Sequence, residues 1–77
     1  MRDNHLMETK EIGARLKSAR LAAQLTQLDV AIRLKLARST VSMIENGSRS
    51  LRAGELEEFV AVYRISLSSL HATGGSE

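Results

Sequence analysis

The chain has 77 residues, a net charge of +2, and no cysteine, tryptophan or proline. A chain of this length makes one small domain that buries only about 60% of its unfolded surface. Without cysteine, neither a disulfide nor a thiolate metal site can stabilise it. No apolar run approaches the ~18 residues of a membrane span, and residues 1–9 lack the apolar stretch of a signal peptide. We therefore expect a cytoplasmic protein.

Charge is distributed unevenly along the chain. Residues 33–52 hold five basic side chains against Glu45 alone, a local balance of +4, whereas residues 53–77 hold Arg64 against four glutamates. A domain that lays its middle against a polyanion would show this distribution, although a scatter of solvated charges gives the same counts.

Helical periodicity begins at Lys10, after a polar segment, residues 1–9, that we expect to be flexible. Apolar residues recur there every three or four positions: Ile12, Leu16, Ala19 and Ala23. Thr26 is a good N-cap residue, and it predicts a second helix over 27–34 with Val30, Ala31 and Leu34 on one face.

The stretch ARSTVSMIENG, residues 37–47, predicts a third, short helix. Val41 and Ile44 lie three apart and can face a core together, while polar residues and Met43 occupy the other side. Asn46-Gly47 is a strong stop signal because both residues tolerate a left-handed backbone.

A fourth helix is expected from about Ala53 to Tyr63. Its inward residues would be Leu56, Phe59, Val60 and Tyr63. Ile65 and Leu67 would close the core, residues 68–71 would add a short further turn, and residues 72–77 would form a flexible tail. No segment alternates long enough to be a strand, so the sequence predicts an all-α domain of four to five helices over residues 10–71.

The segment LTQLDVAIRLKLARSTVSMIENGSRSL is similar to the helix-turn-helix core of the phage-repressor and Cro-type family, also called the XRE family. The features that carry the resemblance are Leu25-Thr26-Gln27, Val30-Ala31, Leu34, the Ser-Thr-Val-Ser run and Ile44-Glu45-Asn46-Gly47. It extends from about Ile12 to Leu70 and implies a compact lambda-repressor-like DNA-binding domain. In such motifs the second helix enters the major groove of DNA.

The resemblance implies which residues meet DNA. Base contacts would come from Arg38, Ser39, Ser42 and Met43, of which an arginine can donate two hydrogen bonds to guanine and a methionine can touch a thymine methyl. Contacts to the DNA backbone would come from Gln27, Asn46, Ser48, Arg49 and Arg52. Thr40 is open between a phosphate contact and local packing.

Three positions depart from the family pattern. Lys35 stands where glycine usually makes the turn, which would cost roughly 1–3 kcal/mol if its φ is positive. Ala37 replaces the usual Ser or Thr cap of the reading helix, a loss of ~1 kcal/mol. Arg64 stands where a glycine commonly ends the fourth helix.

Two charged residues are expected to pair. In this family Arg20 and Glu45 resemble an ion pair between the first helix and the end of the reading helix; the alternative is two solvated charges. Such a pair orients elements more than it stabilises them.

No chemistry of catalysis or metal binding is predicted. His5 and His71 lack acidic or thiol partners at ligand spacing, Ser39 and Ser42 have no neighbouring base, and Glu57-Glu58 is typical of a solvated helix face. We therefore expect a protein that is not an enzyme and needs no cofactor.

The expected function is a sequence-specific regulator, most often a repressor in this family, that binds double-stranded DNA as a homodimer. Leu67 and Leu70 would form the dimer interface, because little core remains for them to enter. One alternative is a module that binds a protein partner through Leu21, Leu28 and Ile32, which otherwise are ordinary exposed aliphatics. Another is the front end of a longer regulator, with HATGGSE as the start of a linker.

Overall fold

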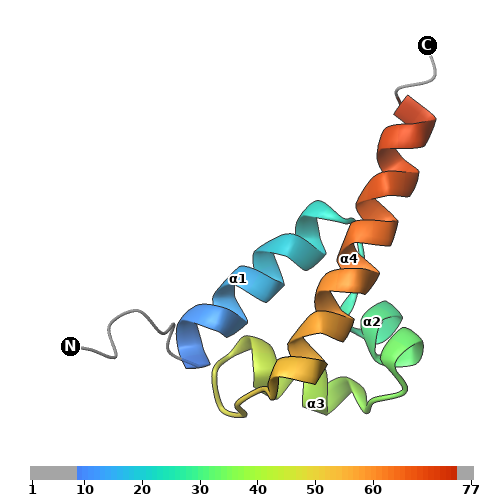
Figure 1. Cartoon of the computed structure of the whole chain (residues 1–77). Helices are drawn as coiled ribbons and strands as arrows, with labels where there is room; N and C mark the ends of the chain where they lie inside the picture. Colours follow the sequence, from blue (N-terminus) through green and yellow to red (C-terminus); the bar gives the residue numbers. More distant parts are fainter. Residues whose placement is uncertain (1–8, 75–77) are drawn as a thin grey trace.

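Within the residues that the structure describes, the chain forms four helices: α1 (Thr9–Ala22), α2 (Gln27–Leu34), α3 (Arg38–Glu45) and α4 (Ala53–Gly74). The structure is a computed structural model that describes residues 9–74, with side chains for residues 9–68. α1, α2 and α3 lie around the lower half of α4, whose last turns extend beyond them (Figure 1). The described residues form helices and turns without a strand, so the expected all-α fold is confirmed.

The core lies where the four helices meet. Val30, Val41, Ile44 and Phe59 are its largest fully buried side chains, and they come from α2, α3 and α4. The ring of Phe59 packs edge-on against that of Tyr63, with ring centroids 6.2 Å apart. Burial, with the nearby Glu45 carboxylate adding to it, raises the pKa of Tyr63 to about 12, so this phenol stays neutral.

The first three helices end in the same way. Just past each end lies one residue with a left-handed backbone: Gln24 (φ 61°), Lys35 (φ 59°) and Gly47 (φ 84°). Its N–H donates to the carbonyl three residues back at 3.0–3.3 Å, and the next N–H donates to the carbonyl five residues back at 2.9–3.1 Å. This pattern satisfies carbonyls that a helix end leaves free. Lys35 therefore has the positive φ that the sequence allowed for, while the left-handed Gln24 was not anticipated.

α4 is longer than the sequence indicated. It continues through Arg64 instead of ending at Tyr63, so the short fifth helix is not a separate element in the described chain. The continued helix turns Ile65 outward, where it is 66% exposed, and the expectation that Ile65 closes the core is wrong. Val60 is also exposed, whereas Leu67 packs against the core as expected.

The ends of the domain are described only in part. Of the expected flexible segments, residues 1–9 and 72–77, Thr9 opens α1 and residues 72–74 belong to α4, while the remainder lies outside the described residues. No helix in the part that the structure describes is long and apolar enough to cross a membrane.

Candidate nucleic-acid interface

α3 has two different sides. Val41 and Ile44 are fully buried and anchor the helix to the core. On the other side Arg38 and Ser39 are exposed, and Met43 is 41% exposed although it is apolar. Ser42 is half-buried at the edge of this surface, and so is Thr40, whose two interpretations both stay open. The four residues expected to read bases thus lie on one short helix.

A three-residue turn sets the position of α3 after α2. The left-handed Lys35 closes α2, and Leu36 packs against the core. Ala37 follows with an extended backbone (φ −73°, ψ 147°) and caps α3 without any side-chain hydrogen bond, as its methyl group dictates. α3 therefore starts immediately after a tight connection, with Arg38 in its first turn.

Arg20 and Glu45 form a buried pair, as the family resemblance implied. Nε of Arg20 lies 2.7 Å from Oε2 of Glu45 and Nη2 lies 3.1 Å from Oε1, while Nη1 donates to the carbonyl of Leu25 at 2.8 Å. The hydrogen bond to Glu45 raises the pKa of Arg20 above its ordinary value despite burial. Because both side chains are almost inaccessible to water, the pair fixes the end of α3 against α1.

A second close contact joins the same two helices. A Cβ added at Gly13 of α1 would lie 2.3 Å from the carbonyl oxygen of Ile44 and 2.7 Å from that of Glu45. These distances are shorter than any real contact, so the last turn of α3 approaches α1 only because residue 13 has no side chain. Sequence analysis gave Gly13 no role, because nothing local marks the contact.

Gln27 continues the network toward the surface. Its Nε2 donates to Oε1 of Glu45 at 3.0 Å, and its Oε1 accepts from Nη1 of Arg38 at 3.2 Å. The resemblance placed Gln27 on a phosphate, and the structure adds two protein partners that the sequence did not indicate. The network draws on residues from three helices, so no local pattern could have marked it.

The loop from α3 to α4 is held by its own polar residues. Asn46 Oδ1 accepts from the N–H of Ser48 at 2.9 Å, a turn that follows directly on the end of α3. Arg49 pairs with Glu55 at 3.1 Å, and the same carboxylate accepts from the N–H of Arg52. The hydrogen bond from Arg49 lowers the pKa of Glu55. The side chain of Arg52 is exposed, whereas Arg49 is already half-buried against α4.

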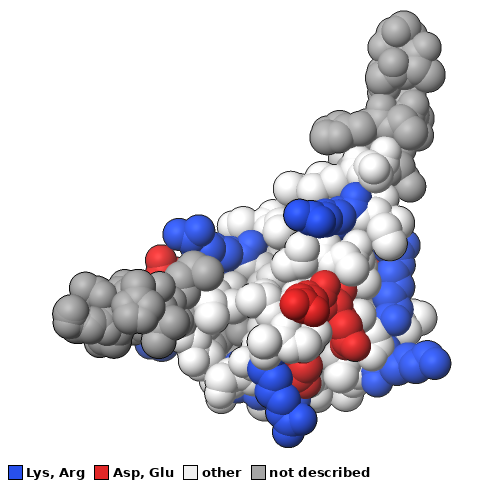
Figure 2. All heavy atoms as spheres, in the orientation of Figure 1, with Lys and Arg blue, Asp and Glu red and all other residues white. Residues whose placement is uncertain are grey.

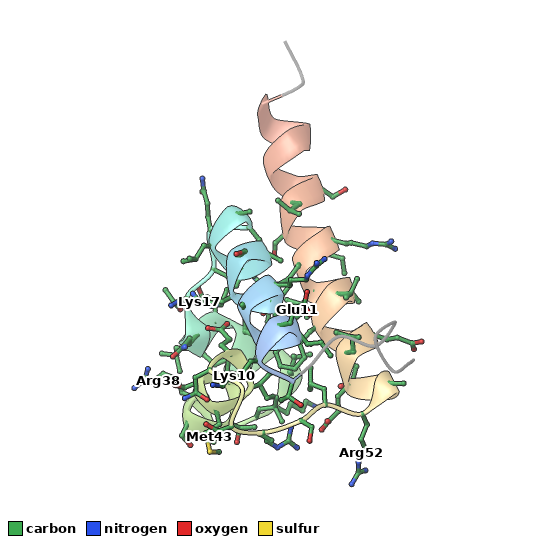
Figure 3. All side chains as sticks on the ribbon, turned by 90° about the vertical axis from the view of Figure 1, so that its left-hand side faces the viewer. Lys10, Glu11, Lys17, Arg38, Met43 and Arg52 are labelled. Atoms are coloured by element: carbon green, nitrogen blue, oxygen red, sulfur yellow. The ribbon has the colours of Figure 1, made fainter. Side chains whose placement is uncertain are left out.

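α1 contributes basic residues that the sequence analysis did not assign. Lys17 and Arg38 project from one edge of the molecule, and Met43 and Arg52 project from its lower end (Figure 3). Lys17 also lines a depression of about 150 Å³ whose other lining residues come from α2, from α3 and from the residue after α3: Gln27, Ser42, Glu45 and Asn46. The opposite charge gathers elsewhere, since acidic side chains cluster over the first half of α4 (Figure 2), which carries Glu55, Glu57 and Glu58.

Two helices joined by a short turn, the second carrying exposed polar groups, define the helix-turn-helix class of DNA-binding proteins. A family model described as a helix-turn-helix domain matches residues 11–72, and the chain belongs to that family. The match is consistent with the XRE-type resemblance. Searches of curated proteins and of solved structures gave no significant match.

Family membership makes the protein a DNA-binding regulator in the broad sense, and such domains are typically not enzymes. The described residues contain no group of three or more histidine, aspartate or glutamate side chains placed to hold a metal ion. His5 and His71, which the sequence analysis set aside, lie outside the residues whose side chains are described.

Proposed function

We propose that the protein is a sequence-specific repressor that recognises its operator through α3. The observation that carries this proposal is the division of α3 into a buried side, Val41 and Ile44, and an outer side with a guanidinium, two hydroxyls and a thioether. A helix whose buried side is held by the core and whose outer side is polar can enter a major groove without any rearrangement of the core. Bound there, it excludes other proteins from the same DNA.

The residues proposed to contact bases are distributed along α3, from Arg38 in its first turn to Met43 near its end. Arg38 at the start of α3 donates two hydrogen bonds to O6 and N7 of a guanine, the commonest specific contact in the major groove. Ser39 and Ser42 contact either donors or acceptors, and Met43 lies against a thymine methyl. These groups discriminate among bases, because each base pair presents a different pattern in that groove.

Backbone contacts would fix the position of the domain on DNA. The proposed set comprises Gln27, Thr40, Asn46, Ser48, Arg49 and Arg52, to which the structure's exposed Lys17 is added. Lys17 and Arg52 are supported by their exposure beside α3, while Arg49 would have to exchange its contact with Glu55 for a phosphate. Such contacts hold the register but carry no sequence information.

Selection of bound sequences from random duplex DNA tests the function, combined with binding measured at several salt concentrations. We expect one enriched motif and a log–log salt slope of roughly −4 to −8 for a dimer, because each phosphate contact contributes about −0.9. No enrichment at low salt, or an affinity independent of salt, would overturn the proposal.

The repressor would act as a two-fold dimer on an inverted repeat. One recognition helix reads only about 4–5 base pairs, and dimers solve this with half-sites about one helical turn, roughly 34 Å, apart. The proposed interface is the C-terminal half of α4, at Leu67 and Leu70. Leu67 is half-buried at the edge of the core, and Leu70 lies outside the residues whose side chains are described.

A charge placed on this part of α4 tests the dimer. Leu70→Asp is expected to abolish dimerisation at micromolar concentration and to weaken operator binding, with the helical content unchanged. Ser68→Asp is the matched control, because Ser68 is exposed on the same helix and receives the same charge. A Leu70→Asp protein that is still dimeric by sedimentation, or a footprint over a single half-site, would contradict this geometry.

A second function, binding to another protein, is favoured by one observation. Leu21, Leu28 and Ile32 are all large aliphatic side chains more than half exposed, at 57%, 53% and 67%. If they bind a partner, Leu28→Lys with Ile32→Lys should abolish that binding and leave the selected DNA motif unchanged. Loss of the motif in this variant would assign these residues to DNA binding or to folding instead.

A further inference from the structure

An apolar groove lies between α1 and α4. One wall is formed by α1 and the other by α4, and the apolar residues that line them are Ile12, Leu16, Ala19, Leu56, Val60 and Leu67. The volume of the groove is about 370 Å³, and its lining surface is almost entirely apolar. Figure 2 shows an uncharged surface between these two helices, with basic side chains near its upper end. None of the groove residues is among those proposed to contact DNA, so DNA binding does not account for the groove.

Two arginines place positive charge at the edge of the groove. Arg15 lines it from α1 and Arg64 lines it from α4, and both side chains are exposed. Because the lining is apolar, these side chains contribute their aliphatic stems to the groove and hold their guanidinium groups at its rim. Glu11 pairs with Arg15 at 3.5 Å in an exposed position, where water competes for the contact. The rim therefore favours an anion, which would meet one guanidinium group from each wall.

The groove fits a hydrocarbon chain better than a peptide. At 1.5 Å per residue, it extends about 10 Å along α1, from Ile12 to Ala19, and about 16 Å along α4, from Leu56 to Leu67. An extended peptide would bring N–H and C=O groups against a lining that cannot satisfy them, a cost that an alkyl chain avoids. A chain of about ten to twelve carbon atoms has a comparable length, since bonded carbon atoms lie about 1.5 Å apart. The volume also lies in the range of small-molecule sites, roughly 300–1,000 Å³.

We propose that this groove binds a single-chain carboxylate, with its alkyl chain between α1 and α4 and its carboxylate on Arg15 and Arg64. A guanidinium presents its N–H groups in a plane that matches the two oxygens of a carboxylate. The proposal goes beyond DNA binding and does not rest on it. Leu67 is the one groove residue shared with the proposed dimer interface, which makes a second copy of the chain the alternative occupant.

Tyr63 supplies a native probe of the groove. It contributes to the lining, and it is the only tyrosine of a chain that has no tryptophan. Tyrosine fluorescence should therefore change saturably when dodecanoate is added below the concentration at which it forms micelles. Decanoate should bind about fifteenfold more weakly, because each buried CH₂ group contributes about fourfold. Dodecyltrimethylammonium has the same chain and a cationic head, and it should bind about tenfold more weakly or worse because the guanidinium groups repel it.

Two pairs of variants locate the site. Val60→Asp puts a carboxylate on the apolar wall and should weaken dodecanoate binding about tenfold or more. Ala61→Asp puts the same charge on the next residue, which is exposed and outside the lining, and should leave binding nearly unchanged. Arg64→Gln should weaken binding about 2- to 5-fold, the effect of an exposed ion pair. Lys35→Gln removes a positive charge outside the groove and should have no effect.

Folding of each variant is verified by circular dichroism and thermal unfolding. Val60 is 37% exposed, so a polar residue there does not enter the buried core. If Val60→Asp nevertheless fails to fold, the comparison of Arg64→Gln with Lys35→Gln decides, because both of these positions are exposed.

Each outcome decides the proposal. Saturable binding that is tighter for the carboxylate than for the ammonium, and that Val60→Asp weakens more than Ala61→Asp does, supports it. No saturable change, equal affinity for the two head groups, or equal effects of the two aspartates would overturn it. If the fluorescence of Tyr63 changes with protein concentration alone and does not respond to dodecanoate, a second copy covers the groove and the proposal is likewise wrong.

Discussion

The first turns of α2 and α3 are built in opposite ways. At α2, the Thr26 hydroxyl accepts from the N–H of Asp29 at 3.0 Å, and the Asp29 carboxylate accepts from the N–H of Thr26 at 2.8 Å. Both orphan donors are thus satisfied by side chains of the same turn. At α3, Ala37 supplies no side-chain cap and the first turn has no acidic residue. The start of α2 is therefore capped by side chains of its own first turn, whereas the start of α3 has no such cap.

The difference shows where α3 gets its stability. Its buried residues are Val41, Ile44 and Glu45, all in its last five positions, and Gly13 of α1 lies against the same end. α3 is therefore held at its C-terminal end by the core, while its first turn, with Arg38 and Ser39, faces solvent. A helix anchored in this way keeps the residues of its first turn available to a ligand.

The largest effect should come from filling the space at Gly13. Gly13→Ala puts a methyl group 2.3 Å from the carbonyl oxygen of Ile44, so α1 or α3 must move. We expect the free energy of unfolding to fall by about 3 kcal/mol, as for overpacked cores. Urea denaturation followed by circular dichroism measures this change.

Gly54→Ala is the matched control for this prediction. Nothing lies within 4 Å of a Cβ at Gly54, which is in the first turn of α4. The same substitution there should be neutral or stabilise by up to ~1 kcal/mol, because alanine favours a helix. Equal effects at the two glycines would mean that α1 does not anchor α3.

The next effect tests the buried pair at the same anchored end. Glu45→Gln leaves an amide N–H₂ facing the donors of Arg20 or Gln27, and we expect a loss of about 1–3 kcal/mol. Glu11→Gln is the control, because the Arg15–Glu11 pair is 3.5 Å long and largely exposed, and it should change stability by under ~0.5 kcal/mol. A double-mutant cycle with Arg20→Met should show coupling; simple additivity would refute the pair's role.

The C-terminal end of α3, which the core holds, was predictable from the sequence. The hydrogen bonds by which Gln27 connects Arg38, at the start of α3, to Glu45 were not. Val41 and Ile44 lie on one helical face, and Asn46-Gly47 is a local stop signal, so the end of α3 follows from neighbouring residues. The Arg20–Glu45 pair followed only from the family resemblance. The bonds of Gln27 join residues 11 and 18 positions apart, and no local signal marks such contacts.

The C-terminal end of α4 was predicted too early in the chain. The expected end near Tyr63 came from the spacing of the apolar residues from Leu56 to Tyr63, and Arg64 was noted only as standing where the family commonly has a glycine. Arginine favours a helix, and no glycine or proline occurs between Gly54 and Gly74, so nothing in the chain stops α4 there. The exposure of Ile65 follows directly, because it lies on the side of the continued helix opposite Tyr63 and Phe59.

A smaller effect compares the two caps directly. Thr26→Ala should destabilise the protein by about 1 kcal/mol, because it leaves the N–H of Asp29 without its acceptor. Ala37→Ser should stabilise it by about 0.5 kcal/mol. The backbone of residue 37 is already extended, as an N-cap requires. The N–H of Thr40, which a serine hydroxyl would bind, already donates to the carbonyl of residue 37, so the added hydroxyl gains less. If Ala37→Ser stabilised as much as Thr26→Ala destabilises, α3 would depend on local capping as α2 does.

The smallest effect is a pH dependence that only the capped helix start can have. The hydrogen bond from the N–H of Thr26 lowers the pKa of Asp29, so the native state binds its proton less readily than the unfolded chain does. Its contribution to stability is therefore complete above the unfolded pKa, about 3.9. It is lost as the pH falls through the lower native pKa.

Asp29→Asn isolates this contribution, because its amide oxygen can accept the same bond but does not titrate. Glu55, whose pKa is also lowered, titrates in both proteins, so it cancels in the comparison. Between pH 5 and pH 2 the urea midpoint of the wild type should fall further than that of Asp29→Asn. Parallel curves would show that the capping carboxylate adds nothing, and then α2, like α3, would be held mainly by the core.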